Sequence, residues 1–488
     1  MFDLAIVGSG FGGSLLAMIA RRLGRSVVLL EKGRHPRFAI GESSTPLANL
    51  LLEELATRYD LPRLRPLTKW GPWQREYPEI GCGLKRGFTF YHPSSDRPLL
   101  VAASPHDEIG DTHWYRPDFD HFLVREVQRM GVVYYDQFAI ERFTPGEIEG
   151  GGLKIRARFV VDATGPRGFL HRALNLPEAP FENLPATEGL YAHFRGVRKL
   201  KAPDEAPPFP VDDAAVHHIF DGGWIWVLRF NNGITSAGAA MTEELAQELN
   251  LSEGEPAWKR LLARLPRVAE LFAEAEPITP FIHHKPLAYR SAQVVGERWA
   301  LLPSAAGFID PLLSTGFPLT LLGVSRLARM IKQESYEELP EYEAETTEAL
   351  LSAERLVAAL YASMSNFPLF SALSLLYFAA ASYTEIARRL GRPELAGAFL
   401  MSDHPQFGQQ LRACCESALS LSDPVALIEQ IDRAIEPIDV AGLGDRRRRN
   451  WYPVKPEDLL NSAGKLGATQ EEIQGLLRRS GFVSDCRI

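Results

Sequence analysis

The chain has 488 residues, a length at which a single hydrophobic core no longer grows, so two or three structural units are expected. Hydrophobic residues make up 45% and charged residues 23%, an ordinary composition for a globular protein. The formal net charge of -8 gives no reason to expect a nucleic acid or an anionic membrane as a partner. The four cysteines (Cys82, Cys414, Cys415 and Cys486) lack metal-ligand spacing, so we expect no metal site and interpret them as reduced thiols of a cytoplasmic protein.

The N-terminal residues follow the order strand, glycine-rich turn, helix, strand. FDLAIV leads into Gly8-Ser9-Gly10-Phe11-Gly12-Gly13, and SLLAMIARRLG and SVVLLE follow. Gly8 is expected to make the tight turn, Gly10 to let the backbone approach a pyrophosphate, and Gly13 to pack the helix closely on the strand. The free N–H groups of the helix start attract the phosphates. Together these features predict a dinucleotide site.

Glu31 ends the second strand, where a carboxylate can accept hydrogen bonds from both ribose hydroxyls. An acid rather than an arginine here argues against a 2′-phosphate, so the predicted ligand is FAD or NAD rather than NADP. Because the chain enters this unit directly, no signal peptide is expected.

The loop that follows runs Ile40-Gly41-Glu42-Ser43-Ser44-Thr45-Pro46. Its hydroxyl groups can donate to a phosphate or flavin, or cap the helix that begins with PLANLLLEELATRY. Local chemistry favours the cap, with Pro46 in the first turn.

The segment GLKRGFTF, residues 83–90, alternates like a strand. Lys85 and Arg86 are neighbours and point to opposite faces, so one of them is expected to face inward. A surface lysine is the commoner case, whereas an inward lysine is either functional or paired.

Further along, WYRPDFD precedes a predicted helix, HFLVREVQRMG, and FVVDATG is a buried strand that ends in small residues beside Asp162. Residues from about 183 to 282 alternate in period two, which predicts a largely antiparallel sheet in which Trp224 and Trp226 share a face.

The segment from Trp299 to Gly316 returns to a buried strand and a small-residue turn. Ser314-Thr315-Gly316, before the helix FPLTLLGVSRLARMI, offers backbone N–H groups to an anion or is an ordinary helix cap. After about Lys332 the pattern is helical. FPLFSALSLLYFAAA, residues 367–381, is too short for a transmembrane segment and predicts a buried helix or the wall of a substrate tunnel.

The glycine turn with Glu31, Arg116, the DATG strand end and AAGFIDP recur in an order that resembles the FAD-binding fold of the aromatic hydroxylase and geranylgeranyl reductase group. Within it, three segments resemble the flavin-dependent halogenases, in their phenol and pyrrole branch rather than the tryptophan branch. Residues 41–46 resemble the GES-x-x-P loop, residues 85–90 the K-x-G-x-x-F stretch with the active-site lysine, and residues 310–316 the DP-x-x-S-[ST]-G halide loop. The resemblance covers roughly residues 1–330.

The resemblance implies an α/β fold with three parts. These are an FAD-binding Rossmann-type domain (1–60, 100–180 and 285–331), a substrate domain with an antiparallel sheet (61–99 and 181–284), and a C-terminal helical region (332–488).

The resemblance also implies the site residues. Lys85 is the catalytic residue, the backbone N–H groups of Thr315 and Gly316 hold halide, and Trp224 and Trp226 line the tunnel. The expected FAD-binding residues are Gly8, Gly10, Phe11, Gly12, Gly13, Glu31, Lys32, Ser43, Ser44, Thr45, Arg116, Asp162, Asp310 and Gly316.

The implied reaction starts from FADH2 and O2, which form a flavin C4a-hydroperoxide. Chloride or bromide attacks it to give hypohalous acid, which travels to a lysine whose pKa is depressed by burial. Only one dinucleotide fingerprint is present, so a separate flavin reductase is the expected partner.

Three departures from the halogenase pattern bear on the prediction. Leu228-Arg229 replaces Ile-Pro of W-x-W-x-I-P, Pro303-Ser304 replaces a Gly-Asp pair that binds the ribityl chain, and Leu313 replaces the glutamate of tryptophan-specific members. The last change points to a phenolic, pyrrolic or carrier-bound substrate. The alternatives are a monooxygenase or geranylgeranyl-reductase-like enzyme without halide chemistry and, more distantly, a non-catalytic flavin-binding protein.

Overall fold

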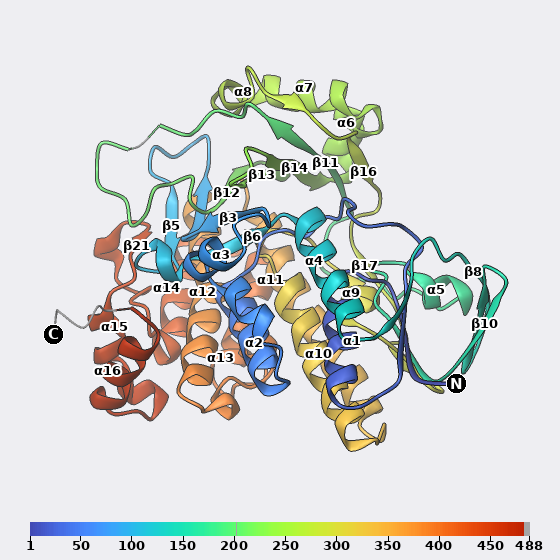
Figure 1. Cartoon of the computed structure of the whole chain (residues 1–488). Coiled ribbons are helices and arrows are strands. Elements are labelled where there is room, and N and C mark those ends of the chain that lie inside the picture. Colours follow the sequence, from blue (N-terminus) through green and yellow to red (C-terminus); the bar gives the residue numbers. More distant parts are fainter. Residues whose placement is uncertain (202, 483–488) are drawn as a thin grey trace.

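The computed structural model describes residues 1–201 and 203–482. Two large sheets and a group of C-terminal helices make up the structure (Figure 1). The first sheet lies near the N-terminus, the second lies across the top of the view, and the orange and red C-terminal helices fill the lower left.

The first sheet has a parallel centre. Its strand order is β18-β19-β10-β1-β2-β7, and β8 and β9 extend β10 as an antiparallel ribbon. VVLL in β2 is buried throughout, as expected of a central parallel strand covered on both faces. The strands are β1 (Phe2–Val7), β2 (Val27–Leu30), β7 (Val133–Tyr135), β8 (Ile140–Thr144), β9 (Glu147–Gly150), β10 (Leu153–Asp162), β18 (Val295–Gly296) and β19 (Trp299–Leu301).

The second sheet is mostly antiparallel, as the alternating pattern predicts. Its order is β15-β11-β14-β13-β12-β4-β5-β21, with β16 beside β11, and the pairs β12–β4 and β5–β21 are parallel. The strands are β4 (Gly87–Tyr91), β5 (Leu99–Ala102), β11 (Thr187–Arg195), β12 (Ala215–Phe220), β13 (Gly223–Arg229), β14 (Thr235–Thr242), β15 (Glu276–Pro277), β16 (Ile282–His284) and β21 (Trp451–Tyr452). Two small sheets pair β3 (Cys82–Lys85) with β6 (Asp111–Trp114) and β17 (Tyr289–Arg290) with β20 (Gly307–Phe308).

Helices cover both sheets. The parallel sheet carries α1 (Phe11–Arg22), α4 (Arg116–Arg129) and α10 (Gly316–Gln333), while α6 (Glu243–Leu249), α7 (Glu255–Arg264) and α8 (Pro266–Leu271) cover the outer face of the second sheet (Figure 1). The remaining helices are α2 (Pro46–Arg58), α3 (Trp70–Glu76), α5 (Phe169–Ala173), α9 (Pro303–Ala306), α11 (Leu339–Ala362), α12 (Phe367–Arg389), α13 (Phe407–Leu419), α14 (Pro424–Ile435), α15 (Pro456–Asn461) and α16 (Gln470–Arg479).

The structure corrects three details of the sequence interpretation. The expected strand over residues 83–90 is two strands in different sheets, because the N–H of Arg86 leaves the ladder and donates to Asp213 O at 2.6 Å. Both Lys85 and Arg86 are buried, rather than one of the two. The C-terminal region is not only helical, since β21 joins the edge of the second sheet.

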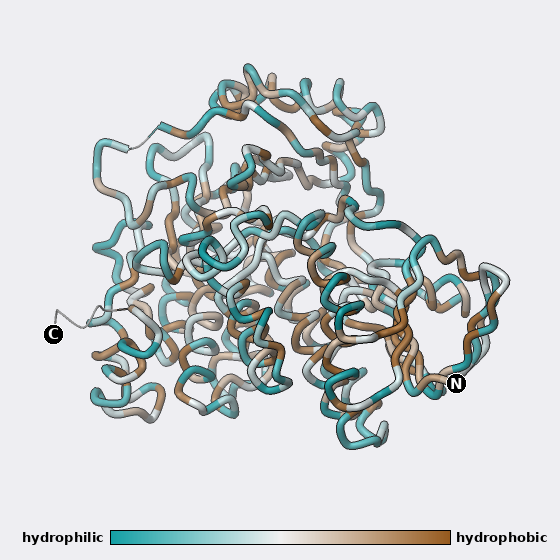
Figure 2. Tube along the Cα trace, in the orientation of Figure 1, coloured by the Kyte–Doolittle hydropathy of each residue, from teal (hydrophilic) through white to brown (hydrophobic). Residues whose placement is uncertain are grey.

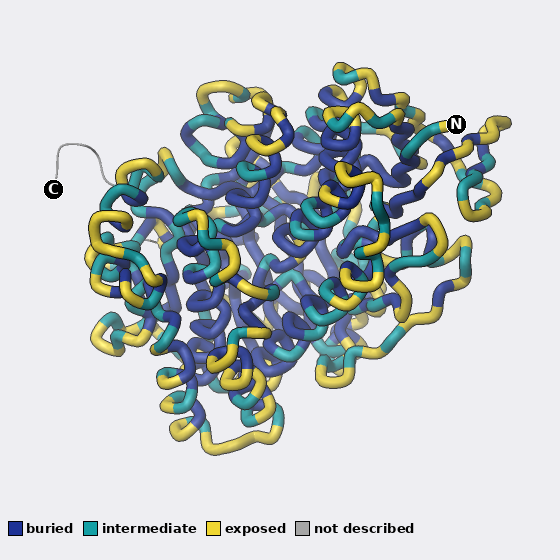
Figure 3. The backbone as a smooth tube through the Cα atoms, turned by 90° about the horizontal axis from the view of Figure 1, so that it is seen from below, coloured by how far each residue is buried: buried dark blue, intermediate teal, exposed yellow. Residues whose placement is uncertain are grey.

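The most hydrophobic helix, α12, has 23 residues and a mean hydropathy of 1.3 over its most apolar window. By length and composition it is the one helix of the described residues apolar enough to cross a membrane, yet 78% of that window is buried inside the protein. Hydrophobic residues recur along the helices and gather in the strands near the N-terminus (Figure 2), and buried backbone fills the centre (Figure 3). Residues 367–381 therefore form part of a buried helix, as predicted.

Among the cysteines, Cys82, Cys414 and Cys415 are free and buried, and Cys486 lies outside the described residues. The described residues bring together no group of three or more His, Cys, Asp or Glu side chains suited to a metal ion.

The glycine turn gives a first testable prediction. A Cβ on Gly13 would lie 2.0 Å from the carbonyl oxygen of Gly8, which is backbone and cannot move aside, whereas a Cβ on Gly10 meets nothing closer than Arg116 at 3.6 Å. We expect Gly13→Ala to lower the melting temperature of the FAD-free protein by roughly 2–4 °C, because α1 is forced away from β1. Gly10→Ala is the matched control and is expected to melt like the wild type while binding FAD more weakly. Equal melting temperatures for the two variants, measured by differential scanning fluorimetry, would contradict this account.

Candidate functional site

The glycine turn connects β1 to α1 as the sequence predicts. Gly8 has a φ of +100°, and α1 begins at Phe11 after Gly10, with no side chain capping its N-terminus. The uncapped N–H groups at this helix start are available to an anion.

Glu31 lies at the carboxyl end of β2 and is fixed by several donors. Its Oε2 accepts from the backbone N and Oγ of Ser9 at 3.0 and 2.9 Å and from Arg37 at 3.1 Å, and its Oε1 accepts from Gly33 N at 2.8 Å. Burial raises the pKa of Glu31, but Arg37 and these hydrogen bonds outweigh it and lower the pKa to about 2. The carboxylate is therefore ionised, and Oε1 keeps acceptor capacity for a ligand hydroxyl.

Two connected spaces run along the carboxyl edge of the first sheet. The outer cleft, about 1520 Å³, is lined by Gly8, Glu31 and Lys32, and the inner cavity, about 1190 Å³, by Gly10, Phe11, Gly12, Arg116 and Gly316, among others. Both are bounded by Arg37, Thr164 and Pro166, so the two spaces adjoin each other. Their position at the glycine turn and the strand ends is where a dinucleotide binds in this type of fold.

Arg116 orders the wall of the inner cavity. Its Nε and Nη2 bind the two oxygens of Asp120 at 2.9 and 2.8 Å, and its Nη1 donates to the carbonyls of Ile40 and Gly41 at 3.1 and 2.7 Å. The arginine therefore connects α4 to the loop over residues 40–46.

A third space, the loop cavity, adjoins the inner cavity and measures about 760 Å³. Residues 314–316, Ser43, Trp224 and Trp226 line it, and it shares Ile40, Gly41, Trp226, Phe308, Pro311, Gly316 and Phe317 with the inner cavity. The helix α10 starts here without a side-chain cap, so its first N–H groups and its positive dipole end lie at this cavity wall.

Lys85 is completely buried and is not part of the lining of the loop cavity. Its Nζ donates to Ser43 Oγ at 2.8 Å and to the Ser44 carbonyl at 2.6 Å, and it lies 3.8 Å from the centre of the Phe88 ring. Burial lowers the pKa of Lys85 to about 7, against a smaller opposing effect of Asp111. Near neutral pH this amine can both donate a hydrogen bond as an ammonium and react as a free base.

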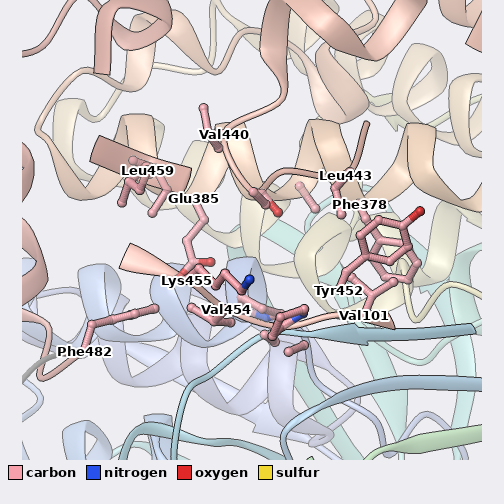
Figure 4. A pocket seen from close by; sticks show the side chains of 18 of the residues that line it. Val101, Phe378, Glu385, Val440, Leu443, Tyr452, Val454, Lys455, Leu459 and Phe482 are labelled. Carbon is pink, nitrogen blue, oxygen red and sulfur yellow. The ribbon is translucent and has the colours of Figure 1, made fainter. Parts of the chain in front are cut away.

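On the other side of Phe88 lies a fourth space, the helix cavity, of about 940 Å³ with its mouth (Figure 4). Phe88, Val101, Phe378 and Tyr452 line it, together with Glu385 of α12 and Leu459 of α15. Ser43 borders the loop cavity and Phe88 borders the helix cavity, and Lys85 contacts both residues. Lys85 itself lines neither space and contacts one lining residue of each.

Four of the expected FAD-binding residues contact other groups of the protein and do not face an open position that a ligand could occupy. Ser44 donates to the Thr112 carbonyl at 2.7 Å, and Thr45 caps α2 by accepting from Ala48 N at 3.1 Å and borders the helix cavity. Asp162 is buried and accepts from Thr164 and from Leu170 N. Gly13 packs against Gly8.

Asp310 borders the loop cavity rather than the inner cavity. Its Oδ1 accepts from Leu312 N at 2.9 Å and its Oδ2 from the Tyr361 hydroxyl at 2.8 Å, so it fixes the turn before α10. Burial raises the pKa of Asp310 to about 6, against the opposing effect of these hydrogen bonds.

The sequence interpretation missed three features of these cavities. Glu42 faces the loop cavity, and its Oε1 is 2.7 Å from His193 Nε2 on β11. Tyr361 and Glu385 come from the C-terminal helices, where no motif marks them. Glu42 lies inside the GES loop and was open to prediction, whereas the other two have no signal outside the tertiary structure.

The departures from the halogenase pattern also have positions. Arg229 pairs with Asp212 at 2.9 Å and does not border the loop cavity, whereas Leu228 does. Ser304 borders the inner cavity, where the family pattern has a carboxylate. Leu313 is buried.

The buried lysine gives a second prediction. Below pH 7 the folded protein carries a buried ammonium at a cost in stability, because burial lowers the pKa of Lys85 from its ordinary value of 10.5 to about 7. Between these two values the unfolded chain binds more protons than the folded one, so the stability of the wild type rises with pH relative to a variant that lacks the amine. We expect the difference between the melting temperatures of Lys85→Met and the wild type, variant minus wild type, to be largest near pH 6 and to decrease steadily toward pH 10. A difference independent of pH would show that the lysine is not desolvated.

Comparison with known proteins places the chain in a family. The tryptophan halogenase family model matches residues 113–367, and an NAD(P)-binding Rossmann-like domain model matches residues 6–49. Monodechloroaminopyrrolnitrin halogenase of Pseudomonas fluorescens is 30% identical over 355 residues, 68% of this chain and 62% of that protein. Tetracycline 7-halogenase of Kitasatospora aureofaciens is 29% identical over 405 residues, 76% of this chain and 72% of that protein.

Among solved structures, halogenase PltM in complex with phloroglucinol and FAD has the same fold, with a TM-score of 0.81 and 23% identity over 92% of this chain and 99% of that one. The cleft, the uncapped start of α1, the ionised Glu31 and the absence of a Cβ at Gly10 fit FAD, the cofactor of such halogenases. The family model covers more than half of the chain, and the halogenase pattern of the sequence agrees with it. The chain therefore belongs to the tryptophan halogenase family of flavin-dependent halogenases.

Proposed function

We propose that this protein uses reduced FAD and O2 to oxidise chloride or bromide to hypohalous acid and that it halogenates an electron-rich aromatic substrate. The observation that carries the proposal is the buried position of Lys85, which contacts Ser43 of the loop-cavity lining and Phe88 of the helix-cavity lining. In this position the lysine would stand between the loop cavity, where hypohalous acid would form, and the helix cavity, where it would react with the substrate.

The cofactor would occupy the outer cleft and the inner cavity. Gly8, Glu31 and Lys32 would hold its adenosine half, and Gly10, Phe11, Gly12, Arg116 and Gly316 would surround the remainder. When bound in the reduced state, FAD supplies together with O2 the two-electron oxidant for halide. Gly13, Ser44, Thr45, Asp162 and Asp310 would act indirectly, by fixing the turns and helix starts around it.

Halide would bind at the N-terminus of α10. The N–H groups of Thr315 and Gly316 border the cavity and no side chain caps the helix, so an anion there gains hydrogen bonds and the helix dipole. Trp226 borders both the inner cavity and the loop cavity, and Trp224 packs 5.5 Å from it, centre to centre. Together the two indoles would keep an aromatic substrate away from the flavin, so that halide is oxidised instead.

Lys85 would then receive the hypohalous acid. Two of its three possible N–H donors are used by Ser43 and Ser44, and the remaining capacity lies beside Phe88 and the helix cavity. There it would hold the hypohalous acid by a hydrogen bond, or carry the halogen as a chloramine, beside the substrate ring. His113 and His217 stay neutral, since burial and then Lys85 lower the pKa of each to about 3, so neither adds a competing charge.

The substrate would be phenolic, pyrrolic or carrier-bound. Leu313 replaces the glutamate expected for free tryptophan, and the apolar helix cavity fits an uncharged ring. We also propose a separate flavin reductase as partner and a cytoplasmic location, because the chain carries one dinucleotide fingerprint and has buried, unpaired cysteines.

The test needs no knowledge of the substrate. FAD-loaded enzyme is supplied with a flavin reductase and NADH, with catalase present, and hypohalous acid is trapped with monochlorodimedone in the presence and absence of chloride or bromide. We expect halide-dependent trapping in the wild type. Oxidation of added phenols without halide incorporation would favour the monooxygenase alternative, and no oxidation at all would favour a flavin-binding protein.

The role of Lys85 gives a third prediction. Lys85→Ala and Lys85→Met are expected to keep trappable hypohalous acid but to lose halogenation of an accepted aromatic substrate by on the order of 100-fold or more, because the reagent is no longer held beside the ring. Product formation is followed by mass spectrometry. Parallel loss of both activities would place Lys85 in the flavin or halide step instead.

Ser304 gives a fourth prediction. Restoring the family carboxylate with Ser304→Asp is expected to lower the dissociation constant for FAD by about tenfold, since a carboxylate gains a charge-assisted hydrogen bond from a ribityl hydroxyl. Ser304→Ala serves as the control and is expected to bind FAD like the wild type within about twofold. Both are measured by equilibrium titration of flavin fluorescence, and weaker binding of the Asp variant would show that Ser304 is not beside the ribityl chain.

A further inference from the structure

Glu385 is a largely buried carboxylate that borders both the helix cavity and a second, more open cleft lined by Glu53 and Arg389. Glu385 is 8% exposed, and its neighbours in the wall include Phe378, Ile386 and Leu459. A carboxylate in such surroundings is costly unless it is paired. Arg389, one turn further along α12, donates from Nε to Glu385 Oε1 at 2.8 Å.

The hydrogen bonds of the described residues give this carboxylate a single side-chain donor, and that donor uses Oε1. A carboxylate accepts several hydrogen bonds, so Oε2 retains its full acceptor capacity. Figure 4 shows Glu385 reaching from α12 toward the middle of the cavity, on the same side as Lys455. Lys455 is exposed, whereas Glu385 is buried, so Glu385 is the stronger determinant of what the cavity accepts.

The helix α12 also sets the distance between Phe378 and Glu385, which both border the cavity. Phe378, Ser382 and Glu385 lie on one face of α12 and all border the cavity. Phe378 packs 5.1 Å from Phe88, centre to centre, and Phe88 lies under the Lys85 ammonium. Seven residues of α-helix separate Phe378 from Glu385, a rise of about 10 Å.

We propose that Glu385 is a specificity-determining residue that binds a hydrogen-bond donor at the far end of the substrate, a hydroxyl, amino or ring N–H group. The substrate class is then an uncharged aromatic of about two rings, or one ring with a short arm. Its reacting ring lies at Phe88 and Lys85, and its distal donor lies at Glu385. This inference rests on the proposed function, since it assigns the substrate of the same site.

The inference also excludes a class of ligand. A substrate with a carboxylate at its distal end would meet the Glu385 carboxylate beside apolar side chains, where two like charges repel each other more strongly than in bulk water. A methyl ether in the same position donates no hydrogen bond. It would remove Oε2 from water without giving it a donor, and the desolvation of this acceptor weakens binding.

The experiment uses three rigid probes of the required length: 4-hydroxybiphenyl, 4-methoxybiphenyl and biphenyl-4-carboxylate. Their dissociation constants for the FAD-loaded enzyme are measured by isothermal titration calorimetry. In the wild type, we expect 4-hydroxybiphenyl to bind at least fivefold more tightly than either other probe. In Glu385→Gln, which keeps the side-chain volume and a hydrogen bond to Arg389, we expect its preference over biphenyl-4-carboxylate to fall below twofold.

Glu53→Gln is the matched control. Glu53 lies 3.8 Å from the same Arg389 and borders the more open cleft that Glu385 also borders, but it is not part of the lining of the helix cavity, so its loss perturbs Arg389 and leaves the residues of that cavity unchanged. This variant is expected to keep the wild-type preference. Glu385→Ala is the second test variant, because it removes the carboxylate in case the glutamine amide still accepts from the hydroxyl, and in it both preferences are expected to fall below twofold.

Three results would overturn the inference. They are a wild type that binds none of the probes, a wild type that binds all three alike, and a preference retained in both Glu385 variants. The binding measurements contain no halide, O2 or reductant, so their outcome is independent of monochlorodimedone trapping. A protein that traps hypohalous acid but fails the probe test refutes the role of Glu385 alone. One that passes the probe test without trapping refutes the proposed reaction and leaves an aromatic-binding site.

Discussion

The burial of the Lys85 ammonium is the constraint on which the site depends. The ammonium is completely buried and contacts Ser43 Oγ, the Ser44 carbonyl and the face of the Phe88 ring. Such an arrangement stores an energetic cost, which shows in the lowering of the lysine pKa to about 7. A protein keeps a cost of this kind where a reactive amine is needed, and here the amine contacts a lining residue of each of two cavities.

The strands and loops around Lys85 bring distant parts of the chain together. The lysine ends β3, the loop over residues 40–46 supplies its oxygen partners, and α10 presents its free N-terminus across the loop cavity. Arg116 binds the carbonyls of this same loop and so connects it to α4 and the inner cavity. The position of the lysine and the shape of the flavin site therefore depend on one loop conformation.

The C-terminal region contributes residues to the cavities. Tyr361 of α11 binds Asp310 before the loop over residues 314–316, α12 lines the helix cavity, and β21 adds a strand to the second sheet. The family model matches as far as residue 367, whereas most residues that line the helix cavity follow it, so a part of the chain outside that match builds most of the proposed substrate site. This division fits a family whose members form hypohalous acid in the same way but halogenate different substrates.

Local sequence determined the parts of this protein whose chemistry is local. The glycine turn needs only neighbouring residues to fold, Gly13 can be read from its spacing, and the alternation of residues 183–282 gives an antiparallel sheet because side chains of a strand alternate between its faces. The cap at Thr45 was favoured on the same local grounds.

Tertiary structure alone decided the features that depend on contacts between distant residues. The sequence is compatible with Lys85 either at the surface or in the interior, and only its contacts with Ser43 and Phe88 show that it is buried. The sequence likewise suggests Asp310 as a cofactor ligand, and only the structure shows that Tyr361, fifty-one residues away, donates a hydrogen bond to it. Glu385 carries no signal at all, because a glutamate near the end of a helix is normally solvated. Its burial follows from the packing of α12 against strands and helices that lie far away in the sequence, and packing of that kind is not encoded in any single stretch of the chain.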